Sequence, residues 1–118
     1  MSVKGQVREV VYYRHYYLNF FNLQSKEVQK KLNWTLGMIA TCHQIPEKYF
    51  KHIEGQKGLY EIRVEMGSNI FRIFSFFDEG NLIVLVNGFQ KKSMKTPHTE
   101  IQRALSIRKQ YYYEKENQ

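Results

Sequence analysis

Three consecutive segments rich in β-branched and aromatic residues constrain the fold of this 118-residue chain more than any other feature. They are Leu59–Met66, Asn69–Phe77 and Leu82–Phe89, and each is long enough for one strand. Gly67-Ser68 joins the first two, and glycine in the leading position suits a two-residue type II′ turn. Residues 78–81, which join the next two, are dense in turn formers. The pattern therefore predicts an antiparallel meander of three strands.

The sequence before this meander predicts one strand and two helices. Val7–Tyr13 is short, β-branched and aromatic, as in a strand, and Tyr16–Leu23 is apolar enough for a short helix. Apolar residues recur at helical spacing from Lys26 to about Cys42, and Ser25 is a suitable N-cap for that helix. In the polar stretch that follows we expect only a helical turn, at Glu47–His52.

A last helix follows the meander. It is expected to begin at Thr96-Pro97, because threonine is a good N-cap and proline is favoured at the first helical position. We expect the polar tail that begins at Tyr111 to fray, with the ordered chain ending near residue 113. Runs of helix and runs of strand indicate an α+β fold. We predict a single domain over residues 1–118, with an antiparallel or mixed sheet of about four strands, N-terminal helices packed on it and a C-terminal helix.

The composition favours a nucleic-acid partner. Lysine and arginine outnumber aspartate and glutamate by 18 to 11, and 15% of the residues are aromatic. Cations neutralise phosphates and aromatic rings stack on bases, although a basic surface can also serve solubility alone. The single cysteine, Cys42, excludes an internal disulfide and any multi-cysteine metal site. No apolar run approaches the roughly 18 residues of a membrane span, so we expect a cytoplasmic protein without membrane contact, metal or cofactor.

The register of the meander places two arginines opposite each other. If Gly67-Ser68 is the loop, Arg63 pairs with Arg72, and the apolar residues that alternate with them point to the other face. If the second turn begins at Asp78 and ends at Asn81, Arg72 also faces Asn87, and Phe89 lies one pair further along. A three-residue loop with a bulge at Gly80 would break this second register.

Two readings of the arginine pair are open. Directly opposed like charges cost stability, and Glu61 and Glu65 on the same face could offset that cost in a salt-bridged, solvated surface. Alternatively, the two guanidinium groups form a clamp that holds phosphate oxygens. We expect a helix to cover the apolar part of this face, which leaves only the arginine end open as a cleft; that apolar part comprises Phe74, Phe76, Ile83 and Leu85.

Further cations follow or precede the meander. Lys91, Lys92 and Lys95 come after its third strand, and Lys57 comes before its first. Adjacent lysines are usually a solvated charge run, so their place in the fold decides their role. His52 and His98 are weaker candidates for proton donors, and the histidines have no spacing typical of metal ligands.

The meander and its exit resemble a known family. The residues that carry the likeness are Gly58–Val64, Asn69–Phe74, Leu82–Ser93 and Lys95-Thr96-Pro97. In them the chain resembles the RelE/ParE toxin superfamily, and in particular its HigB-like, phage-derived branch. The likeness extends from the first strand through the last helix.

This resemblance implies a toxin of a type II toxin–antitoxin system that acts as a ribosome-dependent mRNA endoribonuclease. In such toxins the 2′-OH of the message attacks the adjacent phosphorus without a metal. Arg63 and Arg72 match the arginines that orient the phosphate and stabilise its charge. The implied partners are the 70S ribosome with its mRNA and a cognate helix-turn-helix antitoxin. Operator DNA is expected to be contacted only by the antitoxin, not by the toxin itself.

The chain departs from its relatives where several of them carry a tyrosine or histidine. Phe89 occupies that region, and it can stack on a base but cannot transfer a proton. We therefore assign catalytic roles to Lys91 and Lys92 beside the two arginines, because neighbouring cations can lower the pKa of a lysine. Further RNA contacts are expected from Lys57, Asn87, Phe89 and Lys95.

Two other functions stay open at this stage. The chain could be a ParE-like toxin that inhibits gyrase, which shares the fold without being a nuclease. It could also be a non-catalytic module that binds RNA or an antitoxin. The paired arginines favour RNA cleavage, because a gyrase inhibitor need not keep a phosphate clamp.

Overall fold

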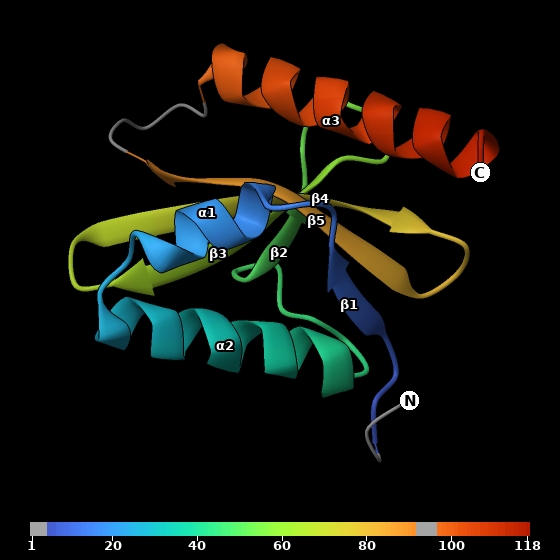
Figure 1. Ribbon diagram of the computed structural model, residues 1–118. Coiled ribbons are helices and arrows are strands. Elements are labelled where there is room, and N and C mark those ends of the chain that lie inside the picture. The colour runs from blue at the N-terminus through green and yellow to red at the C-terminus, as the bar shows by residue number, and fades with distance from the viewer. Residues whose placement is uncertain (1–4, 92–96) are drawn as a thin grey trace.

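The computed structural model describes residues 5–91 and 97–118. Within them, five strands and three helices follow one another as β1 (Glu9–Tyr12), α1 (Tyr16–Asn22), α2 (Lys26–Thr41), β2 (Phe50–His52), β3 (Tyr60–Met66), β4 (Asn69–Asp78), β5 (Leu82–Lys91) and α3 (His98–Glu116). The strands form one mixed sheet in the order β1-β5-β4-β3-β2, in which β1 is parallel to β5 and the other neighbours are antiparallel. Helices α1 and α2 lie on one side of the sheet and α3 lies on the other (Figure 1). The predicted α+β architecture is therefore confirmed.

Strand β2 is the element that the sequence did not predict. A helical turn was expected at Glu47–His52, but Phe50–His52 instead pairs with β3 at the edge of the sheet. The turn is confined to the residues before it, where the Tyr49 N–H donates to the Pro46 carbonyl at 2.9 Å. The Phe50 ring stacks on that of Tyr60 at 4.9 Å, and this packing on β3 favours a strand over a helical turn.

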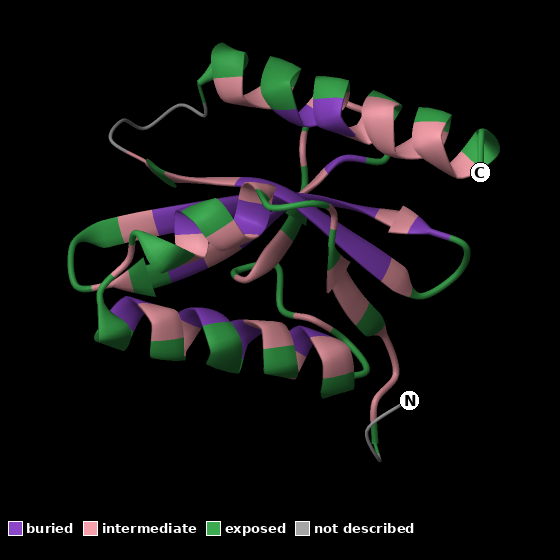
Figure 2. Cartoon of the chain, in the orientation of Figure 1, coloured by how far each residue is buried: buried purple, intermediate pink, exposed green. Residues whose placement is uncertain are grey.

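The sheet has a hydrophobic core on each face. One core lies under α1 and α2, and the other lies under α3, so the buried residues of the helices all face the sheet (Figure 2). Burial of the predicted meander residues is confirmed, since these four are at most 3% exposed: Ile62, Val64, Phe71 and Ile73. Phe74 and Phe76 lie under α3 as expected. Ile83 and Leu85 do not, because they belong to the core of the opposite face.

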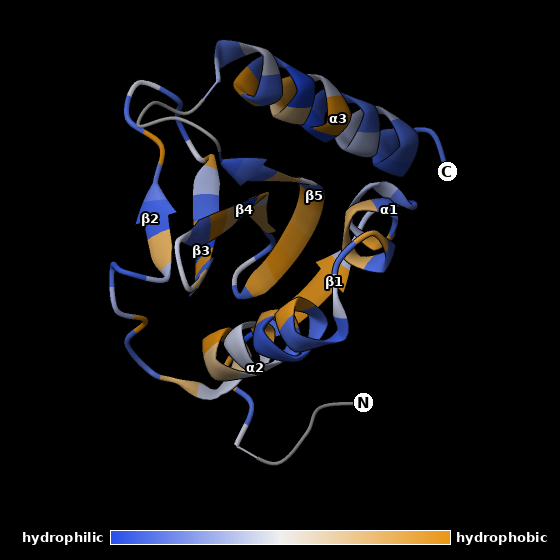
Figure 3. Ribbon diagram, turned by 90° about the vertical axis from the view of Figure 1, so that its left-hand side faces the viewer, coloured by the Kyte–Doolittle hydropathy of each residue, from blue (hydrophilic) through white to orange (hydrophobic). Residues whose placement is uncertain are grey.

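Helix α2 is bounded by side chains at both ends. The hydroxyl of Ser25, the predicted N-cap, accepts the Val28 N–H at 3.2 Å. At the other end the Arg8 guanidinium donates to the carbonyls of Ile39, Cys42 and His43, where a cation also complements the helix dipole. Between these caps the hydrophobic face of α2 is turned toward the sheet (Figure 3). None of the described helices is long and apolar enough to cross a membrane.

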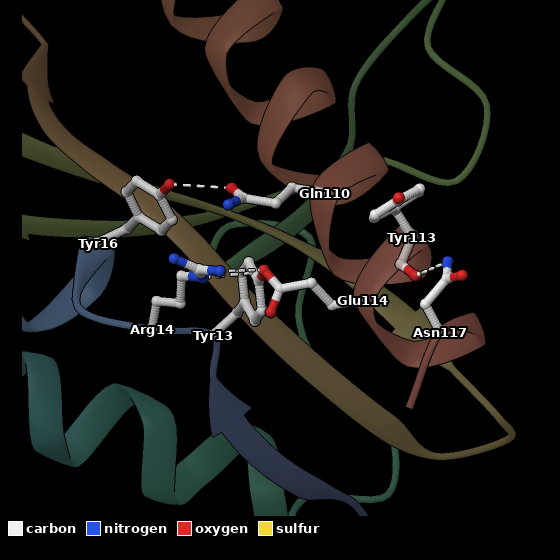
Figure 4. A network of polar contacts seen from close by, with 7 residues as sticks. All are labelled: Tyr13, Arg14, Tyr16, Gln110, Tyr113, Glu114 and Asn117. Atoms are coloured by element: carbon white, nitrogen blue, oxygen red, sulfur yellow. Dashed lines mark hydrogen bonds and ion pairs between the residues drawn. The ribbon is translucent and has the colours of Figure 1, made fainter.

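Helix α3 continues to Glu116, beyond the point where we expected the tail to fray. The reason is a set of tertiary contacts that sequence periodicity does not show. Tyr13 and Arg14 both bond to Glu114, as Figure 4 shows. On the β4 side, the Asp78 carboxylate accepts bonds from Tyr111 at 2.6 Å and Lys115 at 2.8 Å. The expected N-cap Thr96 lies outside the described residues, and Pro97 occupies the N-cap position without a side-chain bond.

The register of β3 and β4 is the predicted one. Arg63 pairs with Arg72, and Val64 pairs with Phe71. Gly67 has a φ of +60°, as the first residue of a type II′ turn requires.

The predicted register of β4 and β5 is wrong, and two features change it. Asp78 pairs with Leu82, so the loop has three residues, and its Glu79 and Gly80 take left-handed conformations. A register shift between Ile73 and Ser75 then leaves two residues of β5 opposite Phe74.

The shift changes which residue of β5 faces the arginines. Arg72 faces Phe89, not Asn87, and Ile70 faces Lys91. The row across the three strands is therefore Arg63, Arg72 and Phe89.

Candidate functional site

The arginine row opens into a pocket at the end of the sheet, on the face that carries α3. The pocket has a volume of about 490 Å³. Its walls come from strands β2 to β5, the residues that flank β2, and the first turns of α3. The residues lining it are Glu47, Lys51, His52, Ile53, Glu54, Glu61, Arg63, Ile70, Arg72, Lys91 and Ile101.

Each arginine has a carboxylate partner from β3. Arg72 is 6% exposed and forms an ion pair with Glu61, which is 3% exposed. Arg63 is more accessible, and its ion pair with Glu65 measures 2.7 Å. The two glutamates thus offset the like-charge contact, as one reading of the sequence required. Burial lowers the pKa of Arg72.

Both guanidinium groups nevertheless keep an unused donor. The Nε–H of Arg63 and that of Arg72 are buried without a hydrogen-bond partner among the described residues. Buried donors of this kind are costly unless something binds them, and they mark sites where a ligand or water completes the bonding. Each arginine is therefore ion-paired, but its hydrogen-bonding capacity is not fully used within the described residues.

Lys91 and Lys51 complete the positive charge of the pocket. Burial lowers the pKa of Lys91, and the charges of Arg72, Arg63 and Lys51 lower it further. The structure thus places Lys91 beside the arginines, in the position the sequence suggested. Lys51 was missed because its segment was interpreted as a helical turn. The three residues of β2 show no apolar–polar alternation that could have found it.

The other predicted RNA contacts lie elsewhere or are not described. Lys57 is exposed and does not line the pocket, and its carbonyl accepts a bond from Arg108 at 3.0 Å. Asn87 is buried, and its amide donates to the carbonyl and carboxylate of Glu100 at 3.3 and 3.1 Å, which anchors α3. Phe89 is half-buried beside Phe74. Lys92 and Lys95 fall outside the described residues.

Neither histidine candidate offers its ring to the arginines. His52 lines the pocket, but its ring packs edge-to-face on that of Tyr60 at a centroid distance of 5.2 Å. His98 is exposed at the start of α3 and does not line the pocket. In the part of the chain that the structure describes, no group of three or more histidine, cysteine, aspartate or glutamate residues is arranged to hold a metal ion.

Cations gathered in a pocket of this kind are suited to anionic ligands such as a phosphodiester. Guanidinium groups hold phosphate oxygens in a fixed geometry and stabilise negative charge that develops on them. A lysine whose pKa is lowered is also a stronger proton donor. Arg63, Arg72, Lys51 and Lys91 provide both properties at one place.

Comparison with known proteins identifies relatives of this chain. Residues 19–109 match the sequence model of the family described as phage derived protein Gp49-like. The free-state structure of the E. coli toxin RelE, in a mutant with two arginines replaced by alanine, is similar to this chain with a TM-score of 0.51 and 15% identity. That similarity covers 69% of this chain and 80% of the RelE chain.

A second solved structure, the archaeal RelE–RelB complex from Pyrococcus horikoshii OT3, is similar with a TM-score of 0.48 and 12% identity. It covers 69% of this chain and 91% of the other. No curated protein matches the chain in sequence. The likeness to the E. coli protein shows that the fold is RelE-like.

Proposed function

The chain belongs to the phage-derived Gp49-like family, and from this premise we propose that it is the toxin of a type II toxin–antitoxin system, an mRNA endoribonuclease that works on the ribosome. The observation that carries the proposal is the pocket lining, in which four cations outnumber three carboxylates. The cations are Arg63, Arg72, Lys51 and Lys91, and the carboxylates are Glu47, Glu54 and Glu61. The RelE-like fold supports the proposal. It agrees with the resemblance of the sequence to HigB-like members of the RelE/ParE superfamily.

In the proposed reaction the 2′-oxygen of one nucleotide forms a bond to the adjacent phosphorus, and the bond from phosphorus to the 5′-oxygen breaks. The products are a 2′,3′-cyclic phosphate and a free 5′-OH. Arg63 and Arg72, which line the pocket, hold the non-bridging oxygens through their guanidinium groups. Removal of one such transition-state donor typically costs about 10²- to 10³-fold in rate.

Lys91 is the proposed general acid. The leaving 5′-oxygen needs a proton, and the 2′-hydroxyl releases its own proton to water. The ammonium group of Lys91 is made more acidic by burial and by the neighbouring cations, so it can supply the proton that Phe89 cannot. Lys92, which we also assign to catalysis, and Lys95, an RNA contact, remain proposals from the sequence.

The other RNA contacts predicted from the sequence lie at different distances from the pocket and receive different proposed roles. Phe89 continues the arginine row and is proposed to contact a base. Lys57 is proposed to attract the RNA backbone from outside the pocket, and Asn87 to support the site through α3. The proposed partners are the 70S ribosome with its message, in the cytoplasm, and a helix-turn-helix antitoxin, because a free nuclease of this kind would kill its host.

The proposal is tested by adding the purified protein to a cell-free translation reaction and mapping message ends by primer extension. Arg63→Ala and Lys91→Met should each reduce cutting by about 10²-fold or more. The matched control is Lys109→Ala, which removes an exposed cation of α3 far from the pocket lining and should cut like the wild type.

The same preparation separates the alternatives. Cuts that need both translation and the pocket cations support the proposal. No cuts together with inhibited DNA supercoiling by gyrase would show a ParE-like toxin, and neither activity would leave a non-catalytic binding module. Cuts on free RNA as well would remove the ribosome from the mechanism.

A further inference from the structure

A second, smaller hollow lies next to the arginine pocket and shares Arg63 with it. Its volume is about 90 Å³, and its lining is Lys31, Lys48, Tyr49, Arg63 and Glu65. The segment before and within β2 separates the two hollows, because its Glu47 and Lys51 line the larger one while Lys48 and Tyr49 line the smaller one. The two sites are thus adjacent parts of one surface.

An exposed tryptophan borders this second hollow. Trp34 is 56% exposed and lies on α2 one turn after Lys31, so both are on the same side of the helix. Its ring packs edge-to-face on the Tyr49 ring at a centroid distance of 6.0 Å. The Lys48 ammonium lies 5.3 Å from the centre of the same tyrosine ring.

The backbone holds this group in place relative to the catalytic arginine. The Tyr49 carbonyl accepts the Arg63 N–H at 2.9 Å, and the Tyr49 N–H donates to Pro46. The two bonds fix the tyrosine beside β3. The aromatic pair is therefore built on the same framework as the phosphate clamp, not on a free loop.

Apart from its contact with Tyr49, Trp34 lies outside the two hydrophobic cores. It is not among the residues that form or pack against either hydrophobic core in the described part of the chain. With 56% of its surface in water, Trp34 leaves a large part of its ring open to a ligand, although the rest packs on Tyr49. Its neighbours Lys31, Lys48 and Arg63 are cations, and aromatic rings among cations are typical of surfaces that bind single-stranded nucleic acid.

We propose that Trp34 and Tyr49, with Lys31 and Lys48, form a second RNA subsite that stacks the base of a nucleotide flanking the one held at the arginines. The inference rests on the proposed function, because it takes RNA as the ligand. Arg63, which lines both hollows, lies between the two subsites. Aromatic residues and arginine are common at protein–protein interfaces too, but lysines are depleted there, and the excess of cations over Glu65 favours the phosphates of RNA.

Tryptophan fluorescence reports on this subsite directly, because Trp34 is the only tryptophan of the chain. The experiment titrates the wild-type protein with a short single-stranded RNA whose 2′-hydroxyls are methylated, so that it binds but cannot be cut. Stacking of a base on the indole should quench the tryptophan fluorescence in a saturable way. Binding of the same RNA, end-labelled, is followed in parallel by fluorescence anisotropy.

Two substitutions at the subsite and one outside it complete the test. Trp34→Ala should weaken RNA binding about tenfold, within the range seen for loss of one stacked base. Trp34→Phe keeps an aromatic face and should recover most of the affinity. Tyr113→Ala removes an aromatic ring from α3 that is 67% exposed, against 56% for Trp34, and should bind like the wild type. Because alanine is the best helix former, the Trp34→Ala variant should remain folded.

The outcomes separate this inference from the proposed function. Equal RNA binding by wild type and Trp34→Ala would overturn the subsite, and message cutting in translation would then still support the nuclease. Quenching and tenfold weaker binding without any message cutting would support the subsite as an RNA-binding surface and refute the nuclease. Fluorescence that responds to a bound antitoxin but not to RNA would assign Trp34 to a protein interface and overturn the inference.

Discussion

The buried ion pair between Arg72 and Glu61 allows the effects of substitution on folding stability and on RNA cleavage to be separated. The two side chains are 7% and 4% exposed. Replacing Glu61 by glutamine leaves the Arg72 guanidinium buried among the other pocket cations, with its neutralising charge removed. Breaking a buried pair by removing one partner costs about 3–5 kcal/mol in free energy of unfolding. For a domain of this size that corresponds to a loss of about 10–20 °C in melting temperature.

A double substitution should recover what the single one loses. Glu61→Leu combined with Arg72→Met replaces both charges by apolar groups of similar volume, and such replacements of buried pairs are often neutral or stabilising. The double variant should therefore unfold near the wild-type temperature and yet fail to cut RNA, because the phosphate clamp has lost a guanidinium.

The matched control is the exposed pair at the rim. Arg63 and Glu65 are 36% and 45% exposed, so Glu65→Gln should cost at most about 1 kcal/mol. Thermal and urea unfolding, followed by circular dichroism, measure all four proteins. A cost below about 1 kcal/mol for Glu61→Gln, or a double variant as unstable as the single one, would refute the reasoning that this pair is desolvated.

Three further predictions follow from single sites. Gly88→Ala should cost about 1–3 kcal/mol in urea unfolding, because the new Cβ would lie 2.6 Å from the Phe20 ring; a neutral result would mean that the ring moves freely. At Asp78, burial raises the carboxyl pKa but bonds from Lys115 and Tyr111 outweigh it and lower the pKa below its usual value. The resulting stability is complete above about pH 4 and is lost as the pH falls through the folded-state pKa, so Asp78→Asn should flatten the acid limb of thermal stability. If Lys91 is the general acid, cutting should decline as the pH rises through its lowered pKa, and Lys91→Arg should move that limb upward; an unchanged pH profile would argue against this role.

The arginine pair could be predicted from sequence because it depends on local rules. Gly67-Ser68 sets a two-residue turn, and the two-residue period of strands then places Arg63 opposite Arg72. No distant contact is needed for this step. The same rules correctly placed Ile62 and Val64 in the core.

The errors arise where distant contacts decide the local structure. The three-residue loop at Gly80 was open as an alternative, but the bulge opposite Phe74 was not foreseen, and Gly88 lies against the Phe20 ring near it. Strand β2 is favoured by the packing of Phe50 on Tyr60. This contact is not visible in the sequence, and Lys51 was therefore not predicted to line the pocket. The last turns of α3 are held by bonds to Asp78 and to the β1–α1 connection, which helical periodicity does not show.

The most direct test of the central claim uses a message with one altered nucleotide. Once the wild-type cut is mapped in cell-free translation, the same message is prepared with a single 2′-deoxynucleotide on the 5′ side of that cut. The proposed pocket supplies charge and a proton but no nucleophile, so cleavage must use the 2′-oxygen of the RNA. The account predicts no cut at the altered position while other positions are still cut. A cut of undiminished intensity there would contradict it.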